Sequence, residues 1–566
     1  MGESMATKKH PKYIFVVGGV ISGVGKGVAS SSIAKLLQDR GLSVTAIKID
    51  PYINIDAGTM NPTEHGEVFV LSDGDETDQD MGNYERFLNI DLTRTNYMTT
   101  GRVYQTVIER ERNLEYHGKC VEVVPHIPLE IIRRIEKARK DARADVVLIE
   151  VGGTVGEYQN MLFLEAARMM KVRNPHDIFF IVVSYLPVPS KVGEMKTKPT
   201  QNAVRTLNAS GIQPDFIIAR AESALDAKRK EKLSFATSVP AKQIISAPDV
   251  ESIYDIPLNF EREHFGDILC ALADLKCSKK ETPARRNWKK FAAKVHGAKE
   301  EVQIAVIGKY FETGDYVLSD SYLSVIEAIK YSAYAEGKKP VLTWLNSAEF
   351  ETPARLDGRS GGNPKRVEDL KKYDGIIVPG GFGTRGVEGK IRAIEFARKH
   401  KIPYFGLCYG MQMLVIEYAR NVLHLKDANT REVNPDAKNI IIDIMENQKE
   451  ILAKKNMGNT MRLGAFPAVL KKGSVAAMAY GKTKITERHR HRYEVNNAYV
   501  SALETAGLVF SGRSPDGNLM EIAELPKSVH PFFLGVQFHP EFLARPLAPH
   551  PLFTAFIKAA TTKKKK

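Results

Sequence analysis

Short apolar runs alternate with helix-like stretches along this sequence, and the alternation occurs twice. The first series starts at Tyr13–Val17 and the second at Val302–Gly308. Alternation of this kind is typical of parallel strands whose connecting helices cover both faces of the sheet. A chain of 566 residues is too long for a single hydrophobic core. We therefore expect two α/β domains, each built on a mostly parallel sheet.

A change in composition separates the two series. Residues 278–299 are rich in Lys and Arg and contain Pro283, which is typical of a linker between domains. We therefore expect a first domain over residues 1–277, a linker over 278–299 and a second domain over 300–558. Residues 559–566 end in a run of lysines and are expected to form a solvated basic tail.

Composition excludes several classes of protein. The chain has four Cys without a disulfide or zinc spacing, so we expect no disulfide framework and a cytoplasmic location. No apolar run reaches the length of a membrane-spanning helix. The net charge is +14, but no nucleic-acid-binding motif accompanies it. The charge therefore favours nucleotide triphosphates over nucleic acid or membranes as partners.

A cysteine between two glycines is the strongest catalytic signal. The run G-L-C-Y-G, residues 406–410, places Cys408 directly after the apolar run Ile402–Phe405. A nucleophile on a sharp strand-to-helix turn is presented in this way, because the flanking glycines accept tight backbone geometry. By itself such a cysteine is more often a small packed residue.

Two further fragments have the chemistry that a nucleophilic cysteine needs. His539 and Glu541 follow the apolar run Phe532–Phe538, and on an extended chain their side chains would point the same way. Glu541 could then orient His539, which could hold Cys408 as a thiolate. The run Pro379–Gly383 could supply backbone N–H groups to an oxyanion.

This set of residues resembles the class I glutamine amidotransferase domain. The resemblance implies that Cys408 attacks the side-chain amide of glutamine, forms a glutamyl thioester and releases ammonia. Each fragment alone favours a structural role, whereas the three together, each at the end of a strand, favour a hydrolase.

A glycine-rich loop follows the first strand. Residues 18–27 contain five glycines and Lys26, and backbone N–H groups of such a loop bind phosphate oxygens at a helix N-terminus. The loop departs from the standard P-loop, since Gly27 replaces the Ser or Thr that binds Mg²⁺. Asp80 and Glu150 are then the candidate Mg²⁺ ligands, although the acidic loop around Asp80 could simply be solvated.

The sequence resembles the CTP synthase family over nearly its whole length. The runs that carry the resemblance are Tyr13–Val20, Lys48–Asn54, His65–Val70, Glu150–Gly156, Lys196–Gln201 and Arg488–Asn496. It implies a P-loop-like, dethiobiotin-synthetase-like amidoligase domain followed by a class I glutaminase domain. The implied reaction makes CTP from UTP, ATP, glutamine and water, and it yields ADP, phosphate and glutamate.

The resemblance also implies roles for individual residues. The residues assigned to ATP are Ser22, Gly23, Val24, Gly25, Lys26, Gly27, Lys48 and Asp80. The residues assigned to UTP, and to CTP as feedback inhibitor, are Ser22, Glu157, Lys196, Lys198, Gln201 and Lys232. Asp80 and Glu150 are the residues assigned to Mg²⁺. The residues assigned to glutamine are Gly381, Phe382, Gln412, Glu432 and Arg492, and Arg385 is assigned to the allosteric activator GTP. We expect Lys196 and Lys198 to share one face of an extended segment.

A homotetramer able to form filaments is the assembly that the resemblance implies. Two alternatives stay open: a glutamine-dependent synthetase with another acceptor, and a non-catalytic assembly protein that keeps the fold. The lysines assigned to UTP count against the first. The intact catalytic and phosphate-binding residues count against the second.

Overall fold

The computed structural model describes residues 10–191, 193–309, 312–313, 316–317, 319–351, 364–445, 448, 458 and 460–562. The last four residues of the expected basic tail, 563–566, lie outside the described residues. Within the described ranges, no helix is both long and apolar enough to cross a membrane.

The chain forms two compact units, and each is described by itself. Residues up to Asp56 and Asn83–Ala292 form the first unit, whereas Ala57–Gly82 and the residues from Ala293 onward form the second. This division differs from the expected domains in two places. Residues 57–82 belong with the second unit, and the first ten residues of the helix in the expected linker belong with the first.

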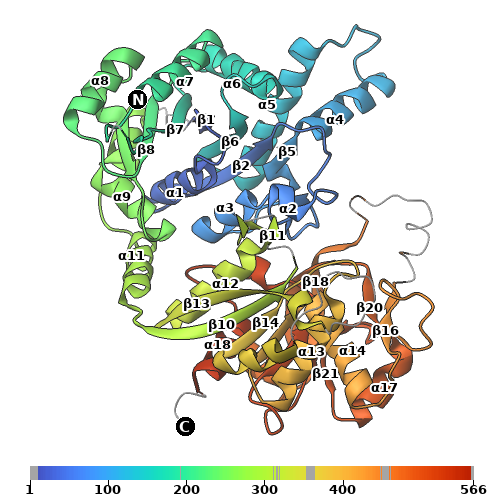
Figure 1. Ribbon diagram of the computed structural model, residues 1–566. Coiled ribbons are helices and arrows are strands. Elements are labelled where there is room, and N and C mark those ends of the chain that lie inside the picture. Colours follow the sequence, from blue (N-terminus) through green and yellow to red (C-terminus); the bar gives the residue numbers. More distant parts are fainter. Residues whose placement is uncertain are drawn as a thin grey trace, which may run out of the picture. The chain divides into compact units, whose positions relative to one another are not determined.

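A parallel sheet forms the centre of the first unit (Figure 1). Its strand order is β5 (Tyr97–Thr99), β2 (Val44–Asp50), β6 (Val146–Thr154), β1 (Lys12–Gly19), β7 (Ile178–Tyr185), β8 (Phe216–Ala221) and β9 (Ile244–Pro248). All adjacent pairs are parallel. The strands are almost completely buried, which explains why they are continuous apolar runs in the sequence.

Helices cover both faces of this sheet. They are α1 (Lys26–Gln38), α4 (Thr100–Arg112), α5 (Val123–Ala142), α6 (Met161–Arg173), α7 (Lys198–Ala209), α8 (Ala227–Thr237), α9 (Ile256–Arg262), α10 (Phe265–Leu272) and α11 (Pro283–Gly297), and α3 (Asp80–Leu88) spans the division between the units. The helices α4, α5 and α6 pack on side chains such as Phe15 and Ile149. Because alternate residues of a strand face opposite sides, neighbours such as Ile14 and Leu148 face the other side of the sheet, where α1 contacts β1, β2 and β6.

The second unit is built on a mixed sheet of nine strands. Its order is β13 (Lys338–Asn346), β10 (Glu300–Gly308), β14 (Gly375–Val378), β15 (Tyr404–Leu407), β23 (Phe533–Val536), β22 (Met520–Glu524), β21 (Val509–Arg513), β18 (Arg462–Leu470) and β19 (Lys484–His491). The strands from β13 to β23 are parallel, as expected. The remainder form an antiparallel extension that the sequence pattern did not indicate.

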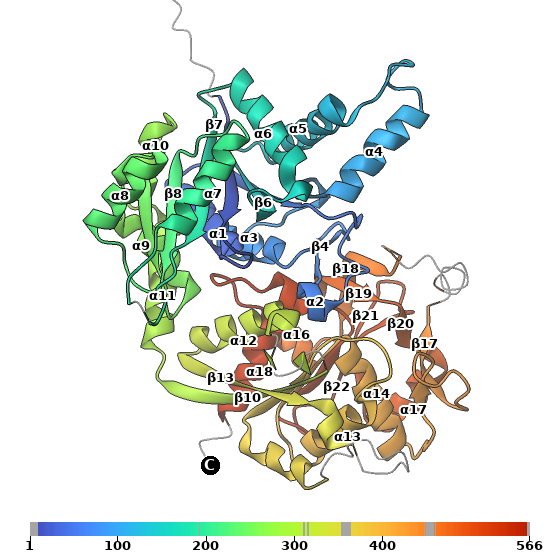
Figure 2. The same cartoon turned by 45° about the horizontal axis from the view of Figure 1, so that its top comes forward.

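Helices and small sheets complete the second unit. The helices are α2 (Pro62–His65), α12 (Leu323–Ala335), α13 (Val387–Lys399), α14 (Tyr409–Asn421), α16 (Val475–Tyr480), α17 (Asn497–Thr505) and α18 (Pro551–Thr562). The short strands are β3 (Phe69–Val70), β4 (Glu76–Thr77), β11 (Glu312–Thr313), β12 (Tyr316–Val317), β16 (Asn429–Thr430), β17 (Ile440–Ile444) and β20 (Tyr493–Val495). Figure 2 shows α12 and α18 together beside β10 and β13.

Residues 57–82 are fastened to the second unit by polar contacts. The backbone N–H of Ser324 donates to the Glu67 carboxylate at 3.1 Å. The Arg488 guanidinium donates to the carbonyl oxygen of Val70 at 3.1 Å, and the Arg490 guanidinium pairs with buried Glu76 at 2.8 Å. A buried ion pair is costly to break, so this segment is an integral part of the second unit.

The cysteines depart from the expectation. We expected no disulfide, whereas the structure joins Cys270, in α10, to Cys277, with the Cα atoms 6.2 Å apart. That expectation was wrong for this pair, because the turn after α10 brings two cysteines seven residues apart within bonding range. Cys120 and Cys408 are free.

Trp288 anchors α11, the helix that lies within the expected linker over residues 278–299. Its side chain is fully buried, its Nε1–H donates to the carbonyl oxygen of Tyr254 at 2.9 Å, and its ring lies 5.0 Å from that of Phe87. Large aromatic side chains contribute heavily to core stability. The first part of α11 is therefore packed structure.

Trp288→Ala should lower the free energy of unfolding by about 3–5 kcal/mol, because it leaves a large cavity and an unpaired carbonyl. Urea unfolding followed by far-ultraviolet circular dichroism measures the change. Trp288→Phe is the matched control and should lose much less. An unchanged unfolding midpoint for Trp288→Ala would show that residues 283–292 are a loosely attached linker.

Candidate active sites

A strained turn presents Cys408 in the second unit. The residue lies between β15 and α14 with φ 49° and ψ −97°, a region that non-glycine residues rarely adopt and that costs about 1–3 kcal/mol. A Cβ atom on Gly410 would lie 2.1 Å from the carbonyl oxygen of Val378, and one on Gly406 would lie 2.6 Å from the carbonyl carbon of Gly410. Both glycines are therefore sterically required for the turn.

His539 and Glu541 are in contact, although not by the expected geometry. His539 Nδ1 lies 2.7 Å from Glu541 Oε1. We expected an extended chain here, but Glu541 lies in a 3-10 helix, Pro540–Leu543. The expectation was wrong because Pro540 occupies the first turn, where its fixed φ favours a helix. The compact turn still brings the two side chains together.

The charge around His539 suits a thiolate–imidazolium pair. Burial lowers the pKa of His539, but the negative charges of Glu541 and Cys408 outweigh burial and raise the pKa to about 10. The protonated imidazole is thus stable in this site near neutral pH. A thiolate next to an imidazolium is the reactive form of a catalytic cysteine.

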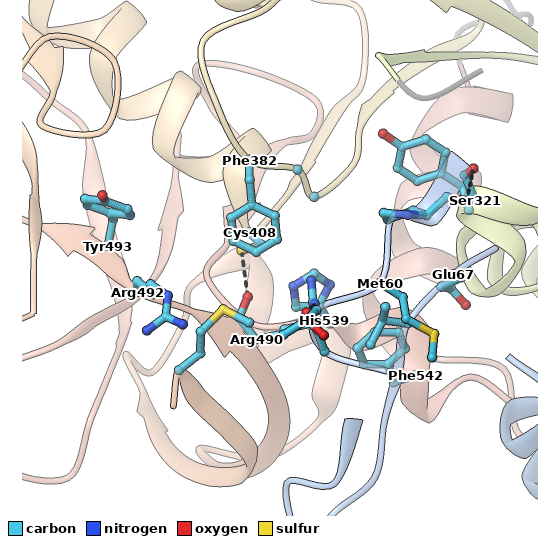
Figure 3. A pocket seen from close by; sticks show the side chains of 18 of the residues that line it. Met60, Glu67, Ser321, Phe382, Cys408, Arg490, Arg492, Tyr493, His539 and Phe542 are labelled. Atoms are coloured by element: carbon cyan, nitrogen blue, oxygen red, sulfur yellow. Dashed lines mark hydrogen bonds between the residues drawn. The ribbon is translucent and has the colours of Figure 1, made fainter. Parts of the chain in front are cut away.

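The Cys408 sulfur has two further neighbours. Its Sγ lies 3.8 Å from the carbonyl oxygen of Arg490, to which the neutral thiol can donate, as Figure 3 shows. Gln537 Nε2 donates to the same sulfur at 3.6 Å. Gln412 Nε2 in turn donates to Gln537 Oε1 at 3.3 Å. Gln412 therefore acts on the cysteine indirectly, through Gln537.

A cavity of about 470 Å³ opens over Cys408. It is lined by Gly58, Thr59, Met60, Pro62, Glu67, Val68, Ser321, Tyr322, Gly380, Gly381, Phe382, Cys408, Glu432, Met461, Arg490, Arg492, Tyr493, His539 and Phe542. Six of the residues singled out from the sequence meet here: Gly381, Phe382, Cys408, Glu432, Arg492 and His539. Arg385 is exposed on the turn before α13 and does not line the cavity.

Sequence reasoning missed the contribution of residues 58–68 to this cavity. The sequence pattern singled out only the run His65–Val70, and it did not single out the lining residues Gly58 to Pro62 that precede this run. A local pattern could not place them, because their position depends on contacts such as that between Glu67 and Ser324, 257 residues away in the sequence.

The cavity holds one acidic and one basic side chain suited to an amino acid. The Glu432 carboxylate accepts the backbone N–H of Gly383 at 2.6 Å. Burial raises the pKa of Glu432, while Gly383 and Lys309 act in the opposite direction. The Arg492 guanidinium donates to Gln448 Oε1 at 2.6 Å and to Thr460 Oγ1 at 3.0 Å. A carboxylate and a guanidinium match an α-ammonium and an α-carboxylate.

The glycine-rich loop of the first unit opens α1. Gly25 caps this helix with φ 85°, and a Cβ atom on it would lie 2.6 Å from Arg220 Nη1. Arg220 also donates to the carbonyl oxygen of Val24 at 3.1 Å, so it braces the loop. Arg220 was not identified from the sequence, since no local pattern connects β8 with the loop. Lys26 Nζ donates to the carbonyl oxygen of Gly153 at 2.8 Å.

Glu150 has the chemistry of a magnesium ligand. Its carboxylate is buried, and it accepts hydrogen bonds from Lys48 at 2.9 Å and from the Tyr84 hydroxyl. Carboxylate oxygens have further lone pairs for a hard cation. No group of three or more His, Cys, Asp or Glu among the described residues could hold a metal. Phosphate oxygens would therefore have to supply the other ligands, as is usual for Mg²⁺.

The residues assigned to UTP lie around the start of α7 and on α8. Lys196 pairs with Glu194 at 2.6 Å. We expected Lys196 and Lys198 on one extended segment, but Lys198 is the first residue of α7. The expectation was wrong because Pro199 favours a helix start at this point. Gln201 is buried in α7, whereas Lys232 is exposed on α8.

Glu157 is close to the glycine-rich loop. It accepts the backbone N–H of Thr154 at 2.9 Å and Gln159 Nε2 at 2.7 Å. A Cβ atom on Gly153, the residue whose carbonyl binds Lys26, would lie 2.6 Å from Glu157 Oε2. The end of β6 thus connects the assigned ATP and UTP residues.

Known proteins resemble the chain over nearly its whole length. A family model described as "CTP synthase N-terminus" matches residues 12–275, and one described as "Glutamine amidotransferase class-I" matches residues 317–559. The CTP synthase of Pyrococcus furiosus is 48% identical over 97% of this chain and 98% of its own length.

Other similar proteins have the same name. The CTP synthases of Methanopyrus kandleri and Symbiobacterium thermophilum are each 46% identical over 97% of this chain, and the matches cover 99% and 98% of those proteins. The solved glutaminase domain of Trypanosoma brucei CTPS with bound acivicin is 37% identical, with 46% of this chain and 94% of that chain covered and a TM-score of 0.41. The full-length matches show that the chain belongs to the CTP synthase family.

Proposed function

We propose that Cys408, His539 and Glu541 hydrolyse glutamine in the second unit, and that the ammonia aminates UTP in the first unit. Membership of the family makes the chain a glutamine-dependent enzyme that converts UTP to CTP with ATP as co-substrate. The observation that carries the residue assignment is the strained turn at Cys408, with His539 in the same cavity and Glu541 hydrogen-bonded to His539.

Glutamine hydrolysis starts with the thiolate of Cys408. The sulfur attacks the carbon of the side-chain amide, and the C–N bond then breaks while the His539 imidazolium gives its proton to the leaving amine. Ammonia departs and a glutamyl thioester remains. Neutral His539 next takes a proton from water, whose oxygen displaces the sulfur and releases glutamate. Glu541 holds His539 in the required orientation through Nδ1.

The rest of the cavity orients the substrate. Backbone N–H groups of the loop at Gly381 and Phe382 stabilise the oxyanion of the tetrahedral intermediate. Glu432 binds the α-ammonium group and Arg492 binds the α-carboxylate, as their opposite charges suggest. Gln412 positions Gln537 against the sulfur.

Amination requires a better leaving group at C4 of uracil. The γ-phosphoryl group of ATP is transferred to the C4 oxygen of UTP, ammonia adds to C4, and phosphate leaves after the nitrogen has lost a proton. Residues 22–27 bind phosphates through their backbone N–H groups, and Lys26 and Lys48 stabilise the transferring phosphoryl group. Mg²⁺, held by Asp80 and Glu150, would neutralise phosphate charge.

UTP and CTP share one triphosphate site in this proposal. Lys196, Lys198, Gln201 and Lys232 bind the triphosphate, and Glu157 is assigned to the base. Lys198 begins α7, where the helix N-terminus adds positive potential. Shared anchoring explains feedback inhibition by CTP. The family resemblance is the basis for four further proposals: GTP as an activator that binds near Arg385, a homotetramer, filaments of that tetramer and a cytoplasmic location.

Cys408→Ala should abolish CTP synthesis from glutamine and leave synthesis from added ammonia, because the two reactions use different residues. The absorbance change of UTP conversion, measured with each nitrogen source, gives both rates. Loss of both activities in a folded variant would contradict the assignment.

Lys26→Ala is the reciprocal variant. It should remove synthesis from either nitrogen source while glutamine hydrolysis continues. Lys137→Ala, which removes an exposed lysine paired with Asp141, is the charge-matched control and should change neither activity.

Lys198→Ala should weaken UTP and CTP together, because a lysine binds phosphate as a point charge and cannot distinguish the two bases. Loss of one charge-assisted contact is worth about 1.5–3 kcal/mol, which is roughly 10- to 150-fold. The KM for UTP and the inhibition constant of CTP measure this effect. Lys228→Ala on α8 is the control. A large rise in one constant alone would mean that CTP is anchored elsewhere.

A further inference from the structure

Tyr409, the residue after the nucleophile, lies between two lysines. Lys309 Nζ is 5.1 Å and Lys390 Nζ is 4.9 Å from the centre of its ring. All three side chains are buried. Cations over an aromatic ring are attracted to its face, but two ammonium groups on one ring would repel each other. The two lysines therefore cannot be equivalent.

Lys309 and Tyr409 both bind the loop that follows β14. Lys309, directly after β10, donates to the carbonyl oxygens of Phe382 and Gly383, the latter at 3.1 Å. The Tyr409 hydroxyl donates to the carbonyl oxygen of Gly383 at 2.9 Å, and Glu432 accepts the backbone N–H of Gly383. These contacts fix the rotation of successive peptide groups. They fix the peptide groups on either side of Gly383, and so they hold the end of the loop that directly follows the N–H groups of Gly381 and Phe382.

Lys390 differs from Lys309 in its partners. It is fully buried on α13, and its Nζ makes no hydrogen bond to any residue that the structure describes. Burial and the charge of Lys309 hold the pKa of Lys390 well below its usual value. An unpaired buried ammonium is costly, so the site favours the neutral form of Lys390 more than that of Lys309.

We propose that Lys309 is a positioning residue for glutamine hydrolysis: its ammonium group holds the carbonyl groups of Phe382 and Gly383, and this anchors the loop so that the preceding N–H groups of Gly381 and Phe382 face the reacting carbonyl. Tyr409 joins this loop to the turn that carries Cys408. The inference rests on the proposed roles of Cys408 and the loop.

This arrangement makes hydrolysis sensitive to alkaline pH. Among the described residues, the charged groups that act on Lys309 are Glu432 and Arg385, and Lys390 lies over the same Tyr409 ring. Burial lowers the pKa of Lys309 to about 8, with Glu432 raising it and Arg385 lowering it. As the pH rises through this value, the ammonium becomes a weaker donor and its hold on the loop declines.

The test compares Lys309→Met with the natural chain. Glutamine hydrolysis is measured from about pH 6.5 to 9.5, and the ratio of the two kcat values is taken at each pH so that ionisation of Cys408 and of glutamine cancels. Below pH ~8 the variant should be roughly tenfold slower or more, since the loss of one oxyanion donor costs about 100- to 1,000-fold. The KM should change little, and the ratio should approach one at the alkaline end.

Controls distinguish a charge effect from damage. Lys390→Met removes the other lysine on the same ring and should leave the pH profile unchanged, because the site favours the neutral form of that lysine. Lys309→Arg should restore activity at high pH. Ammonia-dependent CTP synthesis reports on folding in every variant.

Two results would overturn the proposal: a pH-independent ratio, or a Lys390→Met variant that behaves like Lys309→Met. Neither result depends on whether Cys408→Ala retains glutamine hydrolysis, which tests the catalytic assignment separately.

Discussion

Backbone strain at Cys408 is the constraint on which the proposed glutaminase site depends. A cysteine at φ 49° persists only if the surrounding structure holds it there. Three features do so: the backbone N–H of Cys408 bonds to the carbonyl oxygen of Val536 at 2.7 Å, Gly410 packs closely on Val378, and α14 begins at the next residue. Because β14, β15 and β23 are adjacent and parallel, their ends deliver the proposed oxyanion loop, the proposed nucleophile Cys408 and His539 to one edge of the sheet.

The glutaminase unit is also completed by sequence that precedes it by hundreds of residues. Residues 57–82 come from within the synthetase half, yet they supply one wall of the cavity over Cys408. Glu76 pairs with Arg490, whose carbonyl oxygen lies 3.8 Å from Cys408 Sγ and whose guanidinium lies 5.3 Å from the centre of the Phe382 ring. The same segment ends near Asp80, an assigned magnesium ligand. Residues that line the cavity over Cys408 and a proposed magnesium ligand therefore lie close together along one short stretch of the chain.

The sequence predicted the features that arise from local patterns. Buried parallel strands are continuous apolar runs, so the runs Tyr13–Val17 and Val302–Gly308 coincide with β1 and β10 within a few residues, and the glycines around Cys408 indicated the turn. Local sequence patterns could not predict the antiparallel extension, the packing of Trp288 or the roles of Arg220, Lys309 and Tyr409. Each depends on contacts between segments that are distant in the sequence. The helix starts at Lys198 and Pro540 were missed because an extended chain was assumed next to a proline that favours a helix.

The central claim is that Cys408 forms a covalent glutamyl thioester, and the most direct test is to observe it. The enzyme is mixed with glutamine, quenched in acid during turnover, where thioesters persist, and analysed by peptide mass spectrometry. The account predicts a glutamyl adduct on the peptide that contains Cys408 and none on the peptide with Cys120, the other free cysteine of the described residues. Rapid glutamine hydrolysis with no adduct on Cys408, or with an adduct on Cys120, would contradict it.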